Sequence, residues 1–517
     1  MKTRSRFAVV LLLAIGVFSV YVWPSRTLHT VLSSDVLALP MFLDHGSMEA
    51  LCASYFDALA AEAPLPASSS TFLPLTSVTN HVEHLRIFNR CYIEKGYQLT
   101  PAARQAEQQL LPFFSELSVL ADRTSFLNGI KQKMDGRGIV VSISDAEVGR
   151  ALNLLRVLNH LGNELPIQFI HLDELSEVSV KLLRYAAMLP RALGRDQRIS
   201  FVNVGRHLAS GFDKHFKGYN RKWFAAIFTS FKEMILMDAD AVPYVAPASF
   251  FDLEGYQETG AYFFRDRELD VLLKKWKIDF YKGLLPNKKT PFGFEVDSAQ
   301  LHNNFFLFDS KHVAESGVVV MDRETHLLGL VIPVALLYFR KSSKILYGDK
   351  DLFWFGQLIS GNSNFTFHYN TAGAMGQIEP TGEVCLAQIA HYGNNTLLWS
   401  NGGLTRCKKR TWVKDYLWYS TFREQYGSIA ELRESYNKPV EVSEIIIPAV
   451  LSDKNEPGTG KRPVSNFNKR ENRGCAATYY CANAMDGGRL IILDSEAKAH
   501  INTVIDVWND HHLYGNL

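Results

Sequence analysis

The sequence predicts an α/β fold with a mostly parallel central sheet, on two observations. Residues 138–143 are typical of a strand that leads into a helix, and residues 166–172 are typical of a second strand. A strand, a helix and a strand within about 35 residues form a βαβ unit, whose strands are parallel. Further along, the four apolar residues 234–237 indicate a strand buried on both faces.

The helix of the βαβ unit has a recognisable start. Ser144 and Glu147 have the spacing of a capping box, and the apolar residues Val148, Leu152 and Leu155 fall on one helical face. The loop before the helix contains neither Gly-x-Gly-x-x-Gly nor a Walker lysine motif. The sequence therefore argues against a dinucleotide fingerprint and against a P-loop.

Two carboxylates follow the buried strand, at Asp238 and Asp240. In an open α/β sheet, ligands bind beyond the carboxyl ends of the strands. Two acids separated by one residue can bind a hard divalent cation that also holds phosphate oxygens. We therefore predict a metal and nucleotide site here. An exposed loop is the alternative, because Asp349 and Asp351 show the same spacing.

Length and composition indicate a globular enzyme. The 517 residues are 47% hydrophobic and 12% aromatic, enough for a large core. The formal net charge is only +2, with acids and bases intermixed. Such a charge distribution lacks the basic surface of a nucleic-acid-binding protein, so we expect no nucleic-acid partner.

The N-terminus is typical of a membrane anchor. Lys2, Arg4 and Arg6 precede the uncharged residues 7–23, whose 17 residues are at the short end of a bilayer-spanning helix. Residues 22–26 offer no small-x-small cleavage site, which favours an uncleaved signal-anchor over a signal peptide. The basic flank would stay in the cytosol, so we expect a single-pass type II protein of the early secretory pathway.

Cysteines and glycosylation sequons fit a lumenal domain. An even number of cysteines in an oxidising compartment predicts disulfides. Sequence does not define the pairing, but the local pairs are Cys52 with Cys91, Cys385 with Cys407, and Cys475 with Cys481. Two acceptor sequons for N-glycosylation begin at Asn364 and Asn394.

The predicted organisation has six parts. They are a cytosolic tail (1–6), a transmembrane signal-anchor (7–23), a stem (24–75), a helical N-terminal part of the lumenal region (76–137), a catalytic domain (138–436) and a C-terminal extension (437–517). The polar insert 454–473 in the extension is predicted to be a mobile loop. In the helical part, Thr100 and Pro101 predict the start of a helix that runs to about residue 127.

The order of several short motifs resembles the fungal Golgi α-mannosyltransferases of glycosyltransferase family 71, especially the α-1,3 branch. The motifs lie between Gly138 and Gly403, at residues 138–141, 231–243, 258–260, 315–317, 348–351 and 398–403. The resemblance implies a GT-A-like nucleotide-diphospho-sugar transferase fold, GDP-mannose as donor, Mn²⁺ at the Asp-x-Asp motif and a mannose-terminated N- or O-linked glycan as acceptor. It also implies a Golgi membrane protein whose catalytic domain is lumenal.

Metal-binding roles are also implied by the resemblance. Asp240 would bind the metal directly, and Asp238 would contact the ribose or bind the metal through water. His391 would be the third protein ligand, since imidazole is a good Mn²⁺ ligand. A surface histidine is the alternative for His391.

Other residues have two interpretations. Lys222 would border the nucleotide. Asp349 would face the sugar or the acceptor and Lys350 would neutralise a phosphate. The alternative is an acid at a helix N-terminus that balances the macrodipole. Glu315 and Ser316 have a structural turn as the alternative to a functional role. Arg265 and Arg267 have a solvated face as the alternative. Trp223 is expected to pack within its helix.

A glycosyltransferase of this kind must stabilise a departing diphosphate, which a divalent cation does as a Lewis acid. An α-linked donor and an α-linked product mean retention of configuration, through an ion pair or through a covalent intermediate. Two rival functions remain open at this stage. One is a lumenal transferase that uses a UDP-sugar, and the other is an inactive glycan-binding or scaffolding relative.

Overall fold

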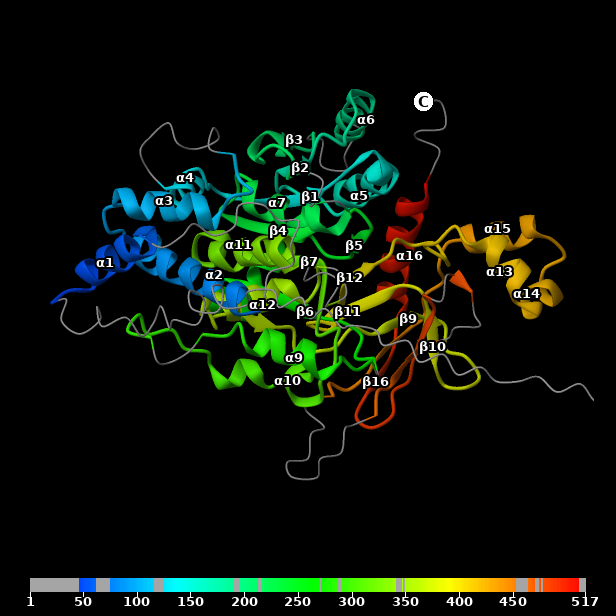
Figure 1. The fold of residues 1–517 in the computed structure, drawn as a ribbon. Helices are drawn as coiled ribbons and strands as arrows, with labels where there is room; N and C mark the ends of the chain where they lie inside the picture. Colours follow the sequence, from blue (N-terminus) through cyan, green and yellow to red (C-terminus); the bar gives the residue numbers. More distant parts are fainter. Residues whose placement is uncertain are drawn as a thin grey trace, which may run out of the picture. The chain divides into compact units, whose positions relative to one another are not determined.

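A seven-stranded sheet is the centre of the protein in this computed structural model. The strands have the order β3-β2-β1-β4-β7-β6-β8, which Figure 1 shows from β3 at the top to β6 below. Their bounds are β1 (Arg137–Ser142), β2 (Ile167–His171), β3 (Ile199–Asn203), β4 (Glu233–Met237), β6 (Ala261–Arg265), β7 (Ala314–Asp322) and β8 (Thr366–Phe367). Only β7 runs antiparallel to its neighbours β4 and β6. The predicted mostly parallel sheet is confirmed.

The structure describes most of the chain after residue 45. The described residues are 46–61, 75–115, 125–188, 196–212, 216, 218–269, 271–286, 290–340, 346, 349–451, 464–469, 474–475 and 478–510. The predicted signal-anchor at 7–23 lies outside them. Within this described part, no helix combines the length and the apolar character needed to cross a bilayer.

Helices pack against the sheet and follow its strands. They include α5 (Val148–His160), α6 (Glu177–Ala187), α7 (Arg221–Phe228), α11 (Arg323–Arg340) and α12 (Leu352–Ser360). The capping box of Ser144 and Glu147 is present in the turn before α5, as predicted. Leu155 of α5 packs in one core cluster with Val141 of β1 and Phe169 of β2. The alternation of strand and helix thus buries the apolar strands on both faces.

A second, three-stranded sheet continues from the end of β4. It has the order β11-β12-β5, with β5 (Ala241–Pro243), β11 (Ile389–Gly393) and β12 (Thr396–Asn401). β5 begins directly after Asp240, and its Ala241 pairs with Asn401 of β12. Figure 1 shows these strands to the right of β4, on the side to which β4 leads. Late residues of the chain therefore lie against the Asp-x-Asp turn.

The N-terminal helices are α1 (Met48–Ala61), α2 (Leu75–Phe88), the π-helix η3 (Asn89–Glu94), α3 (Pro101–Leu110) and α4 (Phe126–Lys131). Thr100 caps α3, because its Oγ1 accepts a hydrogen bond from Ala103 N at 3.1 Å. The cap is confirmed, but the predicted helix to residue 127 is too long, since α3 ends at Leu110. The predicted disulfide between Cys52 and Cys91 joins α1 to η3.

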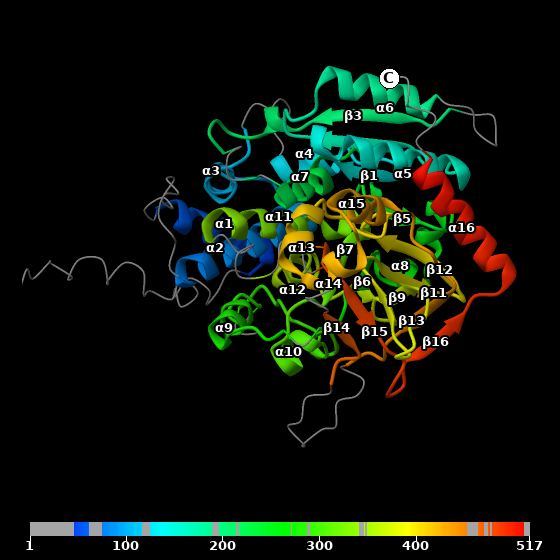
Figure 2. The ribbon, with the colours of Figure 1, turned by 90° about the vertical axis from the view of Figure 1, so that its right-hand side faces the viewer.

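The C-terminal residues complete the same core. α16 (Ser495–Asn509) packs against α5 (Figure 2), and its Val504 and Trp508 belong to the core cluster of β1. The other late elements are β9 (Ala374–Gly376), β10 (Val384–Leu386), α13 (Trp412–Trp418), α14 (Ser420–Gln425), α15 (Ile429–Asn437), β13 (Glu444–Ile447), β14 (Phe467–Lys469), β15 (Tyr480–Ala482) and β16 (Arg489–Ile492). β14 lies within the insert that the sequence predicted to be a mobile loop, and its Phe467 is buried.

Short elements connect these parts. They are η6 (Asp145–Glu147), η7 (Gly205–His207), η9 (Gly218–Asn220), η10 (Pro247–Asp252), α8 (Glu254–Thr259), α9 (Lys275–Lys282), η11 (Ser298–Leu301) and α10 (Asn304–Phe308).

Two of the three predicted disulfides were wrong. The observed bonds join Cys385 to Cys481 and Cys407 to Cys475. β10 pairs antiparallel with β15, and this register places Cys385 directly opposite Cys481. Pairing between strands about a hundred residues apart depends on the tertiary fold, so proximity in sequence is a poor guide to it.

Candidate functional site

The Asp-x-Asp turn is held from both sides by backbone hydrogen bonds. Asp238 N donates to Gly317 O of β7 at 2.8 Å. Asp240 O accepts from Gly402 N at 3.0 Å and from Gly403 N at 2.9 Å, directly after β12. The two carboxylates thus stand on a rigid turn at the carboxyl end of β4, where an open sheet binds its ligands.

Lys222 of α7 connects the first acid to a second acidic segment. Its Nζ lies 2.7 Å from Asp238 Oδ1 and 3.1 Å from Asp349 Oδ2. Burial lowers the pKa of the Lys222 ammonium, but the two carboxylates outweigh burial and raise it overall. Ser316 Oγ also donates to Asp349 Oδ2, at 2.9 Å. The structure therefore brings together three residues that the sequence had predicted separately.

The carboxylates in this part of the site outnumber the lysine. Burial, together with the neighbouring Asp240 and Asp349, raises the pKa of Asp238 to about 7 in spite of Lys222. A lysine shared between two acids leaves excess negative charge at the turn. Such a donor set fits a hard divalent cation, which would relieve the repulsion between the acids.

A second ion-pair cluster lies beside the first. Lys350 Nζ contacts Glu315 and lies 3.1 Å from Asp266 Oδ2, while Arg267 Nε lies 3.4 Å from Asp266 Oδ1. Burial alone would raise the pKa of Asp266, but Lys350 and Arg267 hold it well below its usual value. The Arg267 guanidinium also lies over the ring of Tyr480, 4.1 Å from its centroid. Lys350 and Arg267 are therefore engaged with partners inside the protein.

An irregularity in β7 builds both clusters. Phe263 of β6 pairs with Val319, but the next residue, Phe264, pairs with Glu315, so residues 316–318 have no partner in the ladder with β6. Bulges re-aim side chains next to functional sites. Here the bulge lets Glu315 face Lys350 while Ser316 faces Asp349. The turn considered for Glu315 and Ser316 is wrong, since both belong to β7.

Gly317 makes this bulge possible. A Cβ atom there would lie 2.7 Å from Cζ3 of Trp399 and 2.9 Å from Nδ2 of Asn401, which is too close for any side chain. Asn401 Nδ2 instead donates to Glu315 Oε1 at 2.8 Å. The close approach of β12 to β7 thus requires glycine, and it places Asn401 at the site.

Asp240 differs from its neighbours because it is unpaired. Within the described part of the chain its carboxylate makes no hydrogen bond and no ion pair. Lys408 is a cation that Asp240 influences electrostatically, and it makes no hydrogen bond or ion pair with the described residues; its stem lies over Gly402. A Cβ atom at Gly402 would come within 3.1 Å of Lys408 Cδ and 3.4 Å of its Nζ.

Lys408 carries a charge that no described carboxylate neutralises through a direct contact. Burial lowers the pKa of the Lys408 ammonium, which Asp240 raises and Arg267 and Lys350 lower further. Sequence analysis missed this residue. The sequence places Lys408 five residues after the Gly402-Gly403 turn, which could have indicated its role. Lys409 and Arg410 follow directly, however, so nothing in the sequence distinguishes Lys408 from these two basic residues.

His391 is not brought into contact with the two acids. It is fully buried on β11, where its ring stacks on Trp399 at 4.1 Å and meets the edge of Phe264. The surface-histidine alternative is therefore wrong. Neither ring nitrogen has a hydrogen-bond partner among the described residues. The ligand atoms of Asp238, Asp240 and His391 do not all lie within 4.8 Å of one another. Among the described residues, only the group Glu383, Cys385 and Cys481 has its ligand atoms that close together.

The helix N-terminus alternative for Asp349 is also decided. Asp349 does not cap a helix with its carboxylate, which bonds Ser316 and Lys222 instead. The residue that precedes α12 is Asp351, whose Oδ1 accepts from Val313 N, Ala314 N and Trp354 Nε1. Asp351 therefore ties α12 to the start of β7.

Trp223 and Arg265 have packing roles in the structure. Trp223 of α7 is fully buried, and its ring stacks on Phe353 of α12 with 4.1 Å between the centroids. Arg265 Nε donates to His368 O at 2.9 Å. Trp223 thus joins α7 to α12, and Arg265 joins β6 to the residue that follows β8.

The fold and the site define a class of protein, an α/β protein with an acidic turn at the end of a central strand. Residues 136–393 match the sequence profile of a family described as "Mannosyltransferase putative". Alpha-1,3-mannosyltransferase MNT2 of Saccharomyces cerevisiae is 35% identical over 398 residues, which are 72% of this chain and 68% of that protein. The chain therefore belongs to this mannosyltransferase family, and the resemblance predicted from its motifs is confirmed.

Other relatives agree with this assignment. Alpha-1,3-mannosyltransferase MNT3 of Saccharomyces cerevisiae is 29% identical over 72% of this chain and 63% of that protein. Among solved structures, core-mannan synthase A (CmsA/Ktr4) from Aspergillus fumigatus in its Mn/GDP form covers 46% of this chain and 73% of its own, with 8% identity and a TM-score of 0.30. An overlap of that size is too small to compare the two sites.

Proposed function

We propose that the protein transfers mannose from GDP-mannose to a mannose-terminated glycan of glycoproteins, forms an α-1,3 linkage and retains the configuration of the sugar. Membership of the mannosyltransferase family and the names of relatives such as MNT2 and MNT3 support this reaction. The observation that carries the proposal is the Asp240 carboxylate, which has no partner among the described residues and stands beside Asp238 at the end of β4. A GT-A-like nucleotide-sugar fold fits the sheet order and this position of the acids.

Asp240 and Asp238 would hold a Mn²⁺ ion in this proposal. Both offer carboxylate oxygens, which suit Mn²⁺, and their excess negative charge needs a cation. When bound, the ion would supply Lewis-acid stabilisation of the departing diphosphate. His391 remains a candidate third ligand on the chemistry of its ring alone, because both of its nitrogens lack a partner in the described structure.

The residues of the chain divide into two roles. Lys408, which no carboxylate of the described residues contacts, would bind the diphosphate and offset the charge that grows on it as the bond to the sugar breaks. Lys222 would orient Asp238 at the edge of the nucleotide site, since the two side chains are 2.7 Å apart. Asp349 and Lys350 are both engaged internally, so they would act as positioning residues through Lys222 and Glu315.

We also propose a location for the enzyme. It would be a single-pass type II protein of the Golgi membrane, with its catalytic domain in the lumen. The basic residues before the apolar segment 7–23 support this orientation. Three disulfides among the described residues support an oxidising compartment.

One experiment tests the reaction. The enzyme is incubated with an α-mannoside acceptor and a panel of GDP- and UDP-sugars, in the presence of Mn²⁺ or of EDTA. We expect transfer from GDP-mannose alone, only with the metal, and an α-1,3 linkage in the product by glycosidase digestion and NMR. Transfer from a UDP-sugar would reject the donor, and full activity in EDTA would reject the metal.

A further inference from the structure

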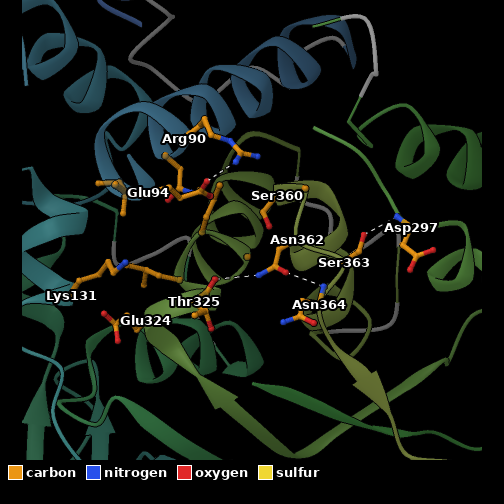
Figure 3. A pocket seen from close by; sticks show the side chains of 16 residues that line it. Arg90, Glu94, Lys131, Asp297, Glu324, Thr325, Ser360, Asn362, Ser363 and Asn364 are labelled. Carbon is orange, nitrogen blue, oxygen red and sulfur yellow. Dashed lines mark hydrogen bonds and ion pairs between the residues drawn. The ribbon is translucent and has the colours of Figure 1, made fainter. Parts of the chain in front are cut away.

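A cavity of about 760 Å³ lies away from the acidic turn (Figure 3). Its walls come from η3, from the start of α11 and from the turn 360–364 that follows α12. α11 begins where β7 ends, and β7 runs antiparallel to β4, so the cavity lies at the opposite end of the sheet from Asp238. The cavity is therefore separate from the proposed transfer site.

The lining of the cavity combines an apolar floor with polar walls. Leu327 and Leu328 are buried beneath it, and its walls carry the amide of Asn362 and the hydroxyl of Ser363. Figure 3 shows the Arg90 and Glu94 side chains, paired at 3.1 Å, on the facing wall. Volumes of this size accommodate small ligands, and amides, hydroxyls and charges over an apolar floor suit a sugar, which has hydroxyl groups and apolar ring faces.

An attachment point for a sugar stands in the wall of the same cavity. Asn364 is exposed, lines the cavity and begins an Asn-x-Thr sequon. Its Nδ2 donates to Thr259 O at 3.2 Å. N-glycosylation replaces one of the two amide hydrogens on Nδ2, so the modified side chain keeps one N–H for this bond.

We propose that Asn364 carries an N-linked glycan whose first sugars lie in this cavity. The attachment brings the sugar to the cavity at no cost in translational freedom, so weak contacts with the walls are enough to hold it. The inference rests on the lumenal location given above, because only a lumenal chain meets the glycosylation machinery. It does not depend on the transfer reaction.

The second sequon provides a matched comparison. Asn394 and Asn395 form the two-residue turn between β11 and β12, with φ values of 51° and 58°, and both are exposed. Neither residue lines the cavity. A glycan on Asn394 would extend from the tip of a hairpin into solvent, so it would be accessible to enzymes.

The test measures site occupancy and protection on the full chain. Glycopeptide mass spectrometry reads both sequons, before and after a peptide N-glycosidase acts on the native and on the denatured protein. We expect Asn364 to be occupied and its glycan to be released at least about tenfold more slowly from the native protein than from the denatured one, because release needs local opening. A glycan on Asn394 should be released at similar rates from both.

Variants separate the glycan from the side chain. Thr366→Val removes the sequon without touching Asn364, and the Thr366 hydroxyl has no hydrogen-bond partner among the described residues. Thr366→Ser keeps the sequon and is the control. We expect the valine variant, but not the serine variant or Asn394→Gln, to melt at a lower temperature. An unmodified Asn364, with or without a glycan on Asn394, would overturn the inference, and so would a glycan on Asn364 that is released equally fast from the native protein. None of these outcomes would change the proposed transfer reaction.

Discussion

Replacing Lys408 with methionine tests the proposed diphosphate contact. Methionine keeps an unbranched stem that can still pack over Gly402, and it removes only the charge. A hydrogen bond to a charged group contributes about 1.5 to 3 kcal/mol. Since about 1.4 kcal/mol is a factor of ten, loss of this contact should weaken GDP binding by roughly 10-fold to 150-fold. The fold should be unaffected, because Lys408 has no ion pair to lose in the described structure.

Calorimetric titrations with GDP and with guanosine isolate the diphosphate. We expect Lys408→Met to lower the affinity for GDP and to leave the affinity for guanosine unchanged, since guanosine has no phosphate. Lys409→Met is the matched control, because Lys409 is the next residue and is exposed. Turnover should fall together with GDP affinity, or further if the contact strengthens in the transition state.

Three outcomes would refute the reasoning. Equal GDP affinity in the Lys408→Met and parent enzymes would remove the contact. An equal loss in Lys409→Met would show a general effect of surface charge, which added salt would screen. A loss for guanosine as large as the loss for GDP would place Lys408 at the nucleoside or would reveal a disturbed fold.

Three other predictions concern the acidic turn, the lysine that pairs with it and a buried carboxylate of α3. Asp240→Asn should abolish Mn²⁺-dependent transfer with an unchanged melting temperature, since the carboxylate has no partner in the described chain, and a large drop in melting temperature would contradict this. Lys222→Met should lower the free energy of unfolding by about 3 to 5 kcal/mol in urea titrations, because it leaves Asp349 buried without a cation, and Lys222→Arg should recover part of the loss. Burial raises the pKa of Glu107 from 4.5 to about 7, so the fold favours its neutral form. The stability from Glu107 is complete below pH 4.5 and is lost as the pH rises through 7, so the parent should melt at a lower temperature at pH 8 than at pH 5. Glu107→Gln should reduce that difference, and an unchanged difference would reject Glu107 as its source.

Local patterns in the sequence predicted much of the framework. The apolar run 234–237 and the βαβ unit at 138–172 identified strands of the central sheet, and Ser144 and Thr100 identified two helix starts. These features depend on neighbouring residues, whose spacing is visible in the chain. The motif order and the position of Asp238 and Asp240 were enough to predict the family. The signal-anchor, the metal and the Golgi location remain predictions.

Contacts between distant segments could be seen only in the folded chain. The sequence presents Lys222, Asp238, Ser316 and Asp349 as separate motifs, whereas the fold joins them through distances of about 3 Å. Lysine and arginine are residue types that often bind phosphate, but the side chains of Lys350 and Arg267 are both paired with internal carboxylates. The pairing of a charge depends on what the opposite segment presents to it, and that is a property of the tertiary structure.

The sequence by itself determined the class of fold, the position of the acidic turn and the family. The first two follow from residue spacing within single segments, and the family follows from the order of several short motifs between residues 138 and 403. Only the tertiary structure decided that Asp240 and Lys408 lack partners in the described chain, that His391 is buried against Trp399, and that Cys385 pairs with Cys481. The physical reason is the same for all three: burial and charge pairing are set by strand register and by the bulge at Gly317, which bring together segments far apart in the chain.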